Sequence, residues 1–337
     1  MKKEINSVDD FSYKVENNGV TITGYKGKRK NVVIPNEIKG FPVVAIGNSA
    51  FMGNLLTNVV IPDSVEKIGF SAFYNNKLTK VIIPDSVKKI GDAAFFHNKR
   101  NGAKNPFSIM MYKNKITIIG YNHKDVVIPQ TDSAWNKYNH KTKDVVIPRE
   151  IEGLPVVAIG DSVFANNLLT NIIIPDSVKK IGDKAFMYNL LTKIVIPGSV
   201  KKIGYAAFFH NKLTNVVIPD SVKKIEYAVF KNNKLTKVII PDSVKKIGDA
   251  AFMNNKLTNF VIPNSVEIIE AYAFENNKLT NVVIPESVET IGKSAFANNK
   301  LTNVIIPDAV ETIEKNAFDN NVKMIRKIVV KNTQNFL

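Results

Sequence analysis

The residues of this chain whose side chains are best suited to catalysis or binding are four histidines and a set of paired lysines. His97 and His210 follow a Phe-Phe pair at one position of a repeated pattern, whereas His123 and His140 flank a stretch between repeats. The chain has no cysteine, and no carboxylates stand at ligand spacing beside the histidines. Metal sites depend on such groupings, and the sequence contains no catalytic constellation. We therefore predict a protein that is not an enzyme, with no catalytic residue, no metal site and no cofactor.

The paired lysines stand between a valine and an isoleucine of the repeated pattern, and they predict a basic ridge. In the central copies they are Lys179, Lys180, Lys201, Lys202, Lys223, Lys224, Lys245 and Lys246. Like charges stacked ~4.8 Å apart repel by up to ~0.9 kcal/mol per neighbour in water, so stability alone does not require them. The formal net charge of +16 also favours anionic partners. The ridge is a candidate site for an acidic polymer, namely a cell-wall polyanion, a sulfated glycan or a nucleic acid.

A solvated face is the other interpretation of these lysines. The repeats also copy single turn lysines such as Lys77, Lys212 and Lys234, and in the final copies Glu267 and Glu289 replace the first lysine of the pair. No aromatic residues interleave with the lysines, which argues against a dedicated nucleic-acid site. Both interpretations remain open at this point.

A repeat of 22 residues carries all of these positions. Its proline returns at Pro62, Pro84, Pro175, Pro197, Pro219, Pro241, Pro263, Pro285 and Pro307. A fixed period of this length indicates one supersecondary coil that buries its apolar side only by stacking on its neighbours. Within the copy that runs from Leu56 to Lys77, the apolar spacing fits two short strands joined by turns. The sequence therefore predicts a solenoid of mostly β and turn content.

Two further columns predict how the coils hold together. A phenylalanine recurs in every copy, from Phe51 to Phe318, and we expect it to form a core column. An asparagine follows three residues later, from Asn54 to Asn321. A buried amide there can donate to one coil's carbonyl and accept from another coil's N–H, satisfying backbone that would otherwise cost ~1–3 kcal/mol per orphaned group. A threonine column that includes Thr57 and Thr236 is interpreted as structural too.

The pattern L-x-x-V-x-I-P-x-S-V-x-x-I-G-x-x-A-F-x-x-N resembles the BspA-like leucine-rich repeats of bacterial surface proteins. The resemblance covers about residues 11–325. It implies a curved solenoid of parallel strands, often used for adhesion to host or matrix proteins. Many members of that family carry cysteine where this chain has asparagine. A secreted or cell-surface location is likewise implied by the resemblance alone. The first residues contain no apolar signal segment, and a cytoplasmic location is the alternative.

The array is interrupted once, which divides the chain. Residues 1–98 are predicted to be an N-terminal cap with three repeats, 99–114 a linker, 115–163 a second cap-like module, 164–325 the main array and 326–337 a C-terminal cap or tail. The segment Phe107 to Tyr121 resembles the opening segment Phe11 to Tyr25. Whether the two arrays form one continuous solenoid is left open by the sequence.

The second module contains an insertion, 130–144, that has no counterpart in the first. Its candidate ligand-binding residues are Trp135, Tyr138 and His140, because loops on rigid scaffolds often carry function. The alternative is a duplicated spacer, since the sequence YNHK occurs twice around it. No run of apolar residues is long enough to span a membrane.

The first strand of each repeat predicts the contact surface. Its fifth residue points away from the core yet is always Val or Ile, and two positions earlier stands Asn or Lys. The candidate contact residues on this predicted concave face are Val195, Val217, Ile239, Val261, Val283, Lys193, Asn215, Lys237 and Asn259. β-branched residues are also simply good strand formers. We expect a protein-binding or adhesion module with a host or matrix protein as ligand. Polyanion binding through the lysines and self-association through the apolar face are the alternatives.

Overall fold

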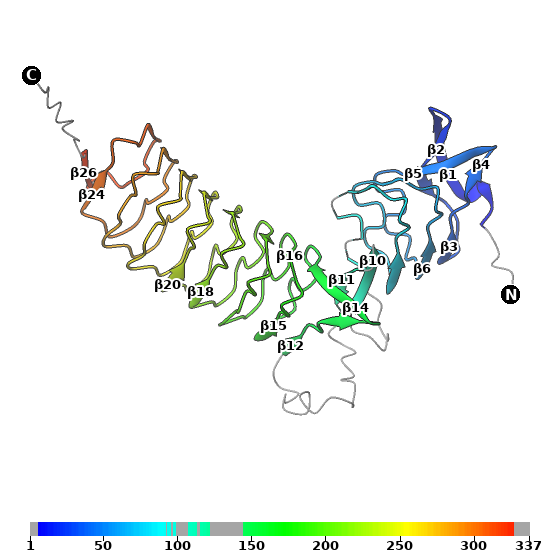
Figure 1. Cartoon of the computed structure of the whole chain (residues 1–337), viewed down its shortest axis with the longest axis horizontal. Helices are drawn as coiled ribbons and strands as arrows, with labels where there is room; N and C mark the ends of the chain where they lie inside the picture. The colour runs from blue at the N-terminus through cyan, green and yellow to red at the C-terminus, as the bar shows by residue number, and fades with distance from the viewer. Residues whose placement is uncertain are drawn as a thin grey trace, which may run out of the picture. The chain divides into compact units, whose positions relative to one another are not determined.

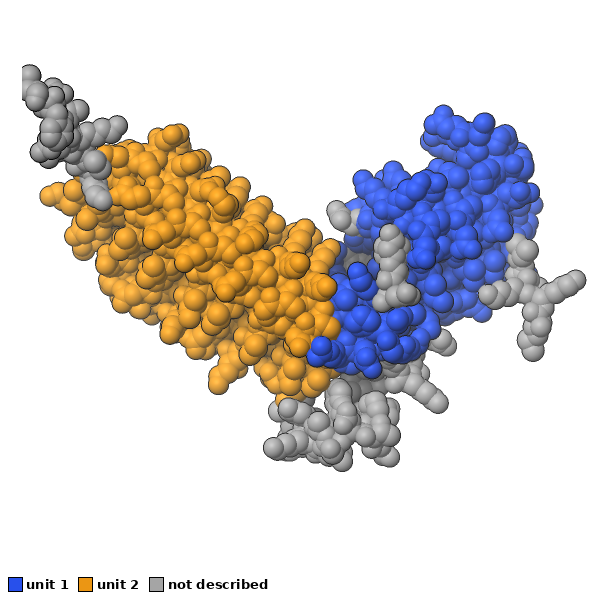
Figure 2. Space-filling view, in the orientation of Figure 1, with its two compact units in different colours: residues 1–139, 148–167 blue, residues 140–147, 168–337 orange. Residues whose placement is uncertain are grey.

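The computed structural model describes residues 6–91, 93–95, 97–98, 107–112, 115–121 and 144–326 (Figure 1). The chain forms two compact units (Figure 2). Unit 1 comprises Met1–Asn139 and Pro148–Asn167, and unit 2 comprises His140–Ile147 and Leu168–Leu337. The insertion residues Trp135, Tyr138 and His140 lie outside the described residues, as does His123.

Unit 1 is built from short strands after one 3-10 turn. Its elements are η1 (Val8–Asp10), β1 (Phe11–Glu16), β2 (Gly19–Tyr25), β3 (Asn31–Val33), β4 (Glu37–Ile38), β5 (Phe41–Ile46), β6 (Asn58–Val60), β7 (Lys67–Ile68), β8 (Lys80–Ile82), β9 (Lys89–Ile90), β10 (Phe107–Tyr112), β11 (Lys115–Tyr121), β13 (Glu150–Ile151) and β14 (Leu154–Ile159). The antiparallel hairpin β1–β2 joins the coils because β2 pairs in parallel with β5, which pairs in turn with β7. The ring of Tyr25 stacks on Phe51 at 5.5 Å, so the hairpin covers the first coil of the phenylalanine column.

The second hairpin, β10–β11, repeats the first in detail. Both hairpins shift register after their second residue pair, at Ser12 and at Ser108. β11 pairs in parallel with β14, as β2 pairs with β5. β10 also pairs in parallel with β8, whereas β1 lies at the end of its sheet. The hairpin begins at Phe107, so the described part of the predicted linker 99–114 is a paired strand.

Unit 2 contains one strand from the second module and the strands of the longer array. They are β12 (Asp144–Val146), β15 (Asn171–Ile173), β16 (Lys180–Ile181), β17 (Lys202–Ile203), β18 (Asn215–Val217), β19 (Lys224–Ile225), β20 (Lys237–Ile239), β21 (Lys246–Ile247), β22 (Ile268–Ile269), β23 (Thr290–Ile291), β24 (Asn303–Ile306), β25 (Thr312–Ile313) and β26 (Lys323–Arg326). Pairing between successive coils is parallel throughout these strands. The prediction of a repeat solenoid of mostly β and turn content is therefore confirmed, although residues 193–195, 259–261 and 281–283, which correspond to first strands, do not form strands.

The phenylalanine column forms the core, as predicted. Phe208 and Phe230 are fully buried, and their rings stack at 5.5 Å with an angle of 1° between their planes. The same stacking continues from Phe186 to Phe318 in unit 2 and from Phe51 to Phe95 in unit 1. Each ring fills the space between neighbouring coils, so no coil can bury its apolar side without the next one.

The asparagine column also behaves as predicted. In a representative coil, Asn76 Nδ2 donates to the carbonyls of Phe51 (2.8 Å) and Phe73 (2.9 Å). Its Oδ1 accepts from the N–H of Leu56 at 2.9 Å. The amide thus satisfies backbone groups of two coils at once. A serine column adds a second ladder, in which hydroxyls such as that of Ser199 donate to the carbonyl of the valine one coil earlier, here Val178 at 2.7 Å.

Two positions in the turn around the phenylalanine adopt the left-handed conformation. One precedes the Ala-Phe pair, as at Ala250 (φ 51°), and the other precedes the ladder asparagine, as at Asn254 (φ 57°). His97 and His210 occupy this second position, with φ of 52° and 55°. Asn and His enter this region more readily than most residues, so backbone geometry accounts for where these two histidines stand.

Backbone pairing is more continuous along the second strand of each coil than along the first. In unit 2 the second strands β19, β21, β22, β23 and β25 form one five-stranded sheet. The first strands form separate pairs, β12–β15, β18–β20 and β24–β26. We call the face formed by the first strands the first-strand face, and its concave shape stays a prediction.

Candidate functional site

The first-strand face aligns the predicted contact residues where its strands pair. The strands β18 and β20 lie side by side (Figure 1). They are in register, so Val217 lies opposite Ile239 and Asn215 lies opposite Lys237. Alternation along a strand sends Val216 and its equivalents into the core and the flanking residues outward. Val217 and Ile239 are accordingly 58% and 46% exposed. The face therefore presents apolar side chains beside amides and amines.

The same face is more open where no strand pairing is assigned. Val195 and Val261 are 80% and 77% exposed, more than Val217 and Ile239 in the paired strands. Val283 is 65% exposed. Lys193 and Asn259 are exposed beside them. Each β-branched side chain thus reaches solvent although its type is typical of buried strands.

The lysine column lies along the second strands. Lys180 lies opposite Lys202 in the pair β16–β17, and Lys224 lies opposite Lys246 in the pair β19–β21. Part of this charge is compensated, because Lys224 pairs with Glu226 at 2.9 Å, Lys246 with Glu270 at 2.5 Å, and Lys245 with Glu267. Within the part of the chain that the structure describes, five members make no ion pair: Lys179, Lys180, Lys201, Lys202 and Lys223.

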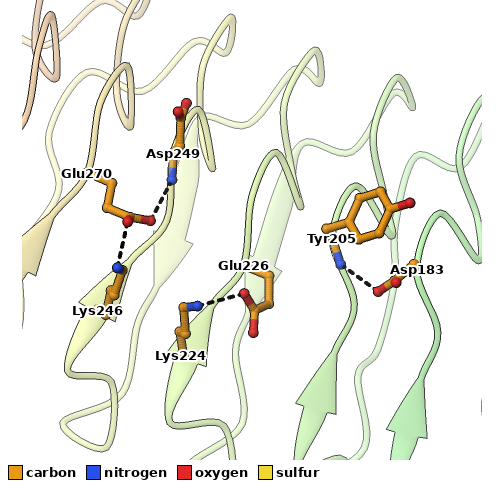
Figure 3. Close-up of polar contacts among 7 residues, drawn as sticks. All are labelled: Asp183, Tyr205, Lys224, Glu226, Lys246, Asp249 and Glu270. Atoms are coloured by element: carbon orange, nitrogen blue, oxygen red, sulfur yellow. Dashed lines mark hydrogen bonds and ion pairs between the residues drawn. The ribbon is translucent and has the colours of Figure 1, made fainter. Parts of the chain in front are cut away.

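A carboxylate cluster limits the column at its C-terminal side (Figure 3). Glu270 accepts from Lys246 Nζ, and its other oxygen accepts from the N–H of Asp249 at 3.2 Å. Burial raises the pKa of the Asp249 carboxyl, and the charge of Glu270 raises it further, while Lys231 lowers it. The Glu267 carboxylate, which accepts a hydrogen bond from Lys245, raises the pKa of that amine. The lysines at this end are therefore engaged with carboxylates of the same protein.

Two exposed tyrosines follow lysine pairs of the column closely in the sequence. Tyr205 and Tyr227 are 39% and 51% exposed, and each follows the second lysine of a pair by three residues. Lys184 Nζ lies 5.2 Å from the centre of the Tyr205 ring. The Tyr205 N–H donates to Asp183 at 3.1 Å, which fixes the start of the turn (Figure 3). The sequence could have indicated these two tyrosines, because the residue after the Ile-Gly or Ile-Glu pair is aromatic in these two coils.

Within residues 6–326, gaps in the description aside, no three His, Asp or Glu side chains gather closely enough to hold a metal ion. Among the same described residues, no helix has the length and apolar character needed to cross a membrane.

The family model described as BspA type leucine rich repeat region (6 copies) matches residues 25–131, 132–257 and 245–336. Among curated proteins, none matches the chain. The matched spans contain both sets of coils, the second hairpin and every residue of the two candidate surfaces.

Solved structures of leucine-rich repeat proteins also resemble the chain. A leucine rich cell surface protein from Faecalibacterium prausnitzii is 26% identical, with 96% of this chain and 95% of that chain covered and a TM-score of 0.41. A leucine-rich repeat protein from Bacteroides ovatus is 22% identical, with 96% and 100% covered and a TM-score of 0.44. The pneumococcal vaccine antigen PcpA is 14% identical, with 97% and 99% covered and a TM-score of 0.43. Classification depends on the family match, which spans nearly the whole chain: this protein belongs to the BspA-type leucine-rich repeat family.

Proposed function

We propose that this protein is a non-enzymatic binding module that attaches to a protein ligand, as an adhesin does, through its first-strand face. The observation that carries the proposal is the row of exposed β-branched side chains, from Val195 at 80% to Ile239 at 46%. Apolar side chains exposed in a row favour a partner that covers them. The neighbouring Asn215 and Lys237 supply hydrogen-bond donors at the edge of the row.

Membership of the BspA-type family supports a location at the bacterial cell surface, where such a module meets host or matrix proteins. Fractionation of the producing cells tests the location separately from binding. Recovery in the cytoplasm would contradict the surface part of the proposal and leave the binding part to be judged by its own experiment.

The test is retention of the purified chain on immobilised matrix proteins, sulfated glycan, cell-wall polyanion and DNA at low and high salt. We expect selective retention on one protein that persists at high salt, because burial of apolar side chains does not depend on ion pairing. The variant Val217→Ser/Ile239→Ser/Val261→Ser should weaken that retention at least tenfold. Unchanged retention would remove the first-strand face as the contact surface.

A matched control changes charge on the other strand. The variant Lys201→Gln/Lys202→Gln/Lys223→Gln/Lys224→Gln should leave protein binding within about twofold. Sedimentation of both variants addresses self-association, since a dimer that only the serine variant dissociates would mean that two copies cover this face.

The lysine column supports a second candidate function, attachment to an anionic polymer. The observation behind it is that five exposed lysines of the column make no ion pair in the described part of the chain. The exposed Tyr205 and Tyr227 follow two of the lysine pairs in the sequence. Basic residues with flanking aromatic rings suit single-stranded nucleic acids and other flexible polyanions. Retention on every polyanion that disappears as salt rises, and that the glutamine variant abolishes, would favour this function over the first.

A further inference from the structure

Unit 1 contains a hollow of about 540 Å³ beside the strands β3 and β6, near the start of the chain. Its lining residues are Arg29, Lys30, Asn31, Val33, Thr57, Asn58 and Val60. The hollow spans the pair β3–β6, in which Asn31 lies opposite Asn58 and Val33 lies opposite Val60. A volume in this range is typical of sites for small ligands or short side-chain groups. We call it the N-terminal hollow.

The segment that contributes Arg29 and Lys30 to the lining is strongly basic. Lys26, Lys28, Arg29 and Lys30 place four cations within five residues, and all four are exposed. Such a cluster raises the local positive potential and attracts anions. The guanidinium of Arg29 adds a planar fork of donors that matches the geometry of a carboxylate.

The backbone of this basic loop is held in place by several hydrogen bonds. The buried Tyr25 hydroxyl donates to the carbonyl of Arg29 at 3.1 Å, and the N–H of Lys26 donates to the carbonyl of Asp10 at 2.7 Å. The N–H of Thr57 donates to the carbonyl of Lys30 at 2.8 Å. The loop is therefore preorganised, so less conformational entropy is lost when a ligand binds.

Hydrogen bonds also orient the donor side chains that line the hollow. The hydroxyl of Thr57 donates to Asn31 Oδ1 at 2.8 Å, which leaves the Asn31 amide NH₂ to serve an acceptor. Lys30 Nζ donates to the carbonyl of Asn54 at 2.8 Å, and an ammonium has two further N–H donors. Val33 and Val60 add apolar side chains to the lining. The hollow therefore combines donors and cations with room for an aliphatic stem.

We propose that the N-terminal hollow binds the carboxylate of an acidic peptide segment, with Arg29, Lys30 and the side-chain amides of Asn31 and Asn58 as donors. A glutamate side chain fits this chemistry, because its methylene groups can lie on the two valines while its carboxylate oxygens accept hydrogen bonds from these donors. The lining contains no aromatic ring, which favours a peptide side chain over a sugar that stacks on such a ring. This proposal goes beyond the proposed function, whose contact residues lie in unit 2.

The second module of the chain provides an internal contrast. Its sequence T-K-D-V-V-I-P stands where the first has R-K-N-V-V-I-P, so Asp144 replaces Asn31. The two positions are equivalent in structure, because Asp144 lies opposite Asn171 and accepts from the Thr170 hydroxyl at 2.9 Å. A carboxylate at this place would repel a carboxylate ligand. The same fold element is thus present twice, with an amide donor at Asn31 in the first copy and a carboxylate at Asp144 in the second.

The experiment is titration of the full chain with a fluorescent Val-Glu-Val-Glu-Val peptide, blocked at both ends, followed by polarisation at low salt. The matched probes are the same peptide with Gln for Glu and an oligogalacturonate of similar charge. We expect the Glu peptide to bind and the other two to bind at least tenfold more weakly. Asn31→Asp and Arg29→Gln should each weaken binding at least tenfold, whereas Lys212→Gln, an exposed turn lysine in unit 2, should leave it unchanged.

Three results would overturn the proposal. They are equal binding of the Gln peptide, unchanged affinity of Asn31→Asp, and binding of oligogalacturonate in place of the peptide, which would assign the hollow to an acidic glycan. Both substituted residues are exposed, and a thermal melt that matches the parent protein confirms folding. Because the serine variant of unit 2 leaves this hollow intact, failure here and failure of the proposed function are distinguishable.

Discussion

The carboxamide of Asn233 donates a hydrogen bond of 2.9 Å to the carbonyl of Phe208, which lies one coil earlier. It also donates to Phe230 at 3.1 Å and accepts from the N–H of Leu213 at 3.1 Å. One buried side chain therefore satisfies three backbone groups. The coils are locked at the same turn that carries the stacked phenylalanine rings, so hydrogen bonding and apolar packing support each other.

Asn233→Ala should lower the free energy of unfolding by about 2–4 kcal/mol, because it leaves three buried backbone groups without a partner at ~1–3 kcal/mol each and some relaxation is expected. Urea denaturation followed by circular dichroism measures the loss. Asn215→Ala, which changes an exposed asparagine on the first-strand face, is the control and should change stability by less than about 0.5 kcal/mol. Equal effects of the two substitutions would contradict the role of the ladder.

Asp249→Asn should stabilise the protein at neutral pH. Burial and the nearby Glu270 raise the pKa of the Asp249 carboxyl above its ordinary value of 3.8. The folded state then binds a proton in a pH range where the unfolded state has lost it, so stability falls as pH rises from 3.8 through the raised pKa. The amide removes this penalty.

Thermal unfolding across pH checks this expectation. The difference in midpoint between Asp249→Asn and the parent protein should be positive at pH 7 and should disappear below the ordinary pKa of an aspartate. Asp242→Asn, at an exposed position, serves as the control. A gain that persists at low pH would show that the effect does not come from the charge of Asp249.

Lys39→Asn should raise stability by about 0.5–1 kcal/mol. Lys39 and Gly40 form the two-residue loop between β4 and β5, with φ of 52° and 78°. Both positive angles identify a type I′ turn, for which Asn-Gly is the preferred sequence. A left-handed lysine costs roughly 1–2 kcal/mol, and asparagine relieves part of that cost. Lys39→Ala keeps the strain and should give no gain in the same urea titration.

The core and its polar ladder could be predicted from the sequence because each depends on one residue type at a fixed spacing. Phe230 and Asn233 are buried, and the other coils carry the same residue types at these two positions. Their roles therefore follow from the 22-residue spacing and from the chemistry of an aromatic ring and an amide. The left-handed turn position differs, since Lys184, Ala228 and Tyr272 all adopt it. Hydrogen bonds to the next coil, such as that from the Lys184 N–H to the Tyr205 carbonyl at 2.8 Å, impose this conformation. The intrinsic conformational preference of a residue gives no information about such contacts with the next coil.

The candidate surfaces were predictable in composition but not in arrangement. Alternation along each strand indicated that Val195 and Val217 face solvent, yet the difference in their exposure depends on which coils pair as strands. Pairing is a property of neighbouring coils, which a single repeat does not encode. The N-terminal hollow depends in the same way on two strands that are distant in sequence, β3 and β6.

Lys202→Glu should stabilise unit 2 at low ionic strength. Lys180 and Lys202 lie opposite each other in β16–β17 and repel, whereas in the adjacent column Glu267 stands one coil after Lys245 and forms an ion pair with it. The substitution places opposite charges across β16–β17 and so converts a repulsion of up to ~0.9 kcal/mol in water into an attraction. Because these groups are exposed, salt screens the gain. The urea midpoint should therefore exceed that of the parent protein in 20 mM salt and approach it in 1 M salt. Lys212→Glu, at a turn, reports the effect of net charge alone, and an equal gain from it would show that the pairing across β16–β17 is not the cause.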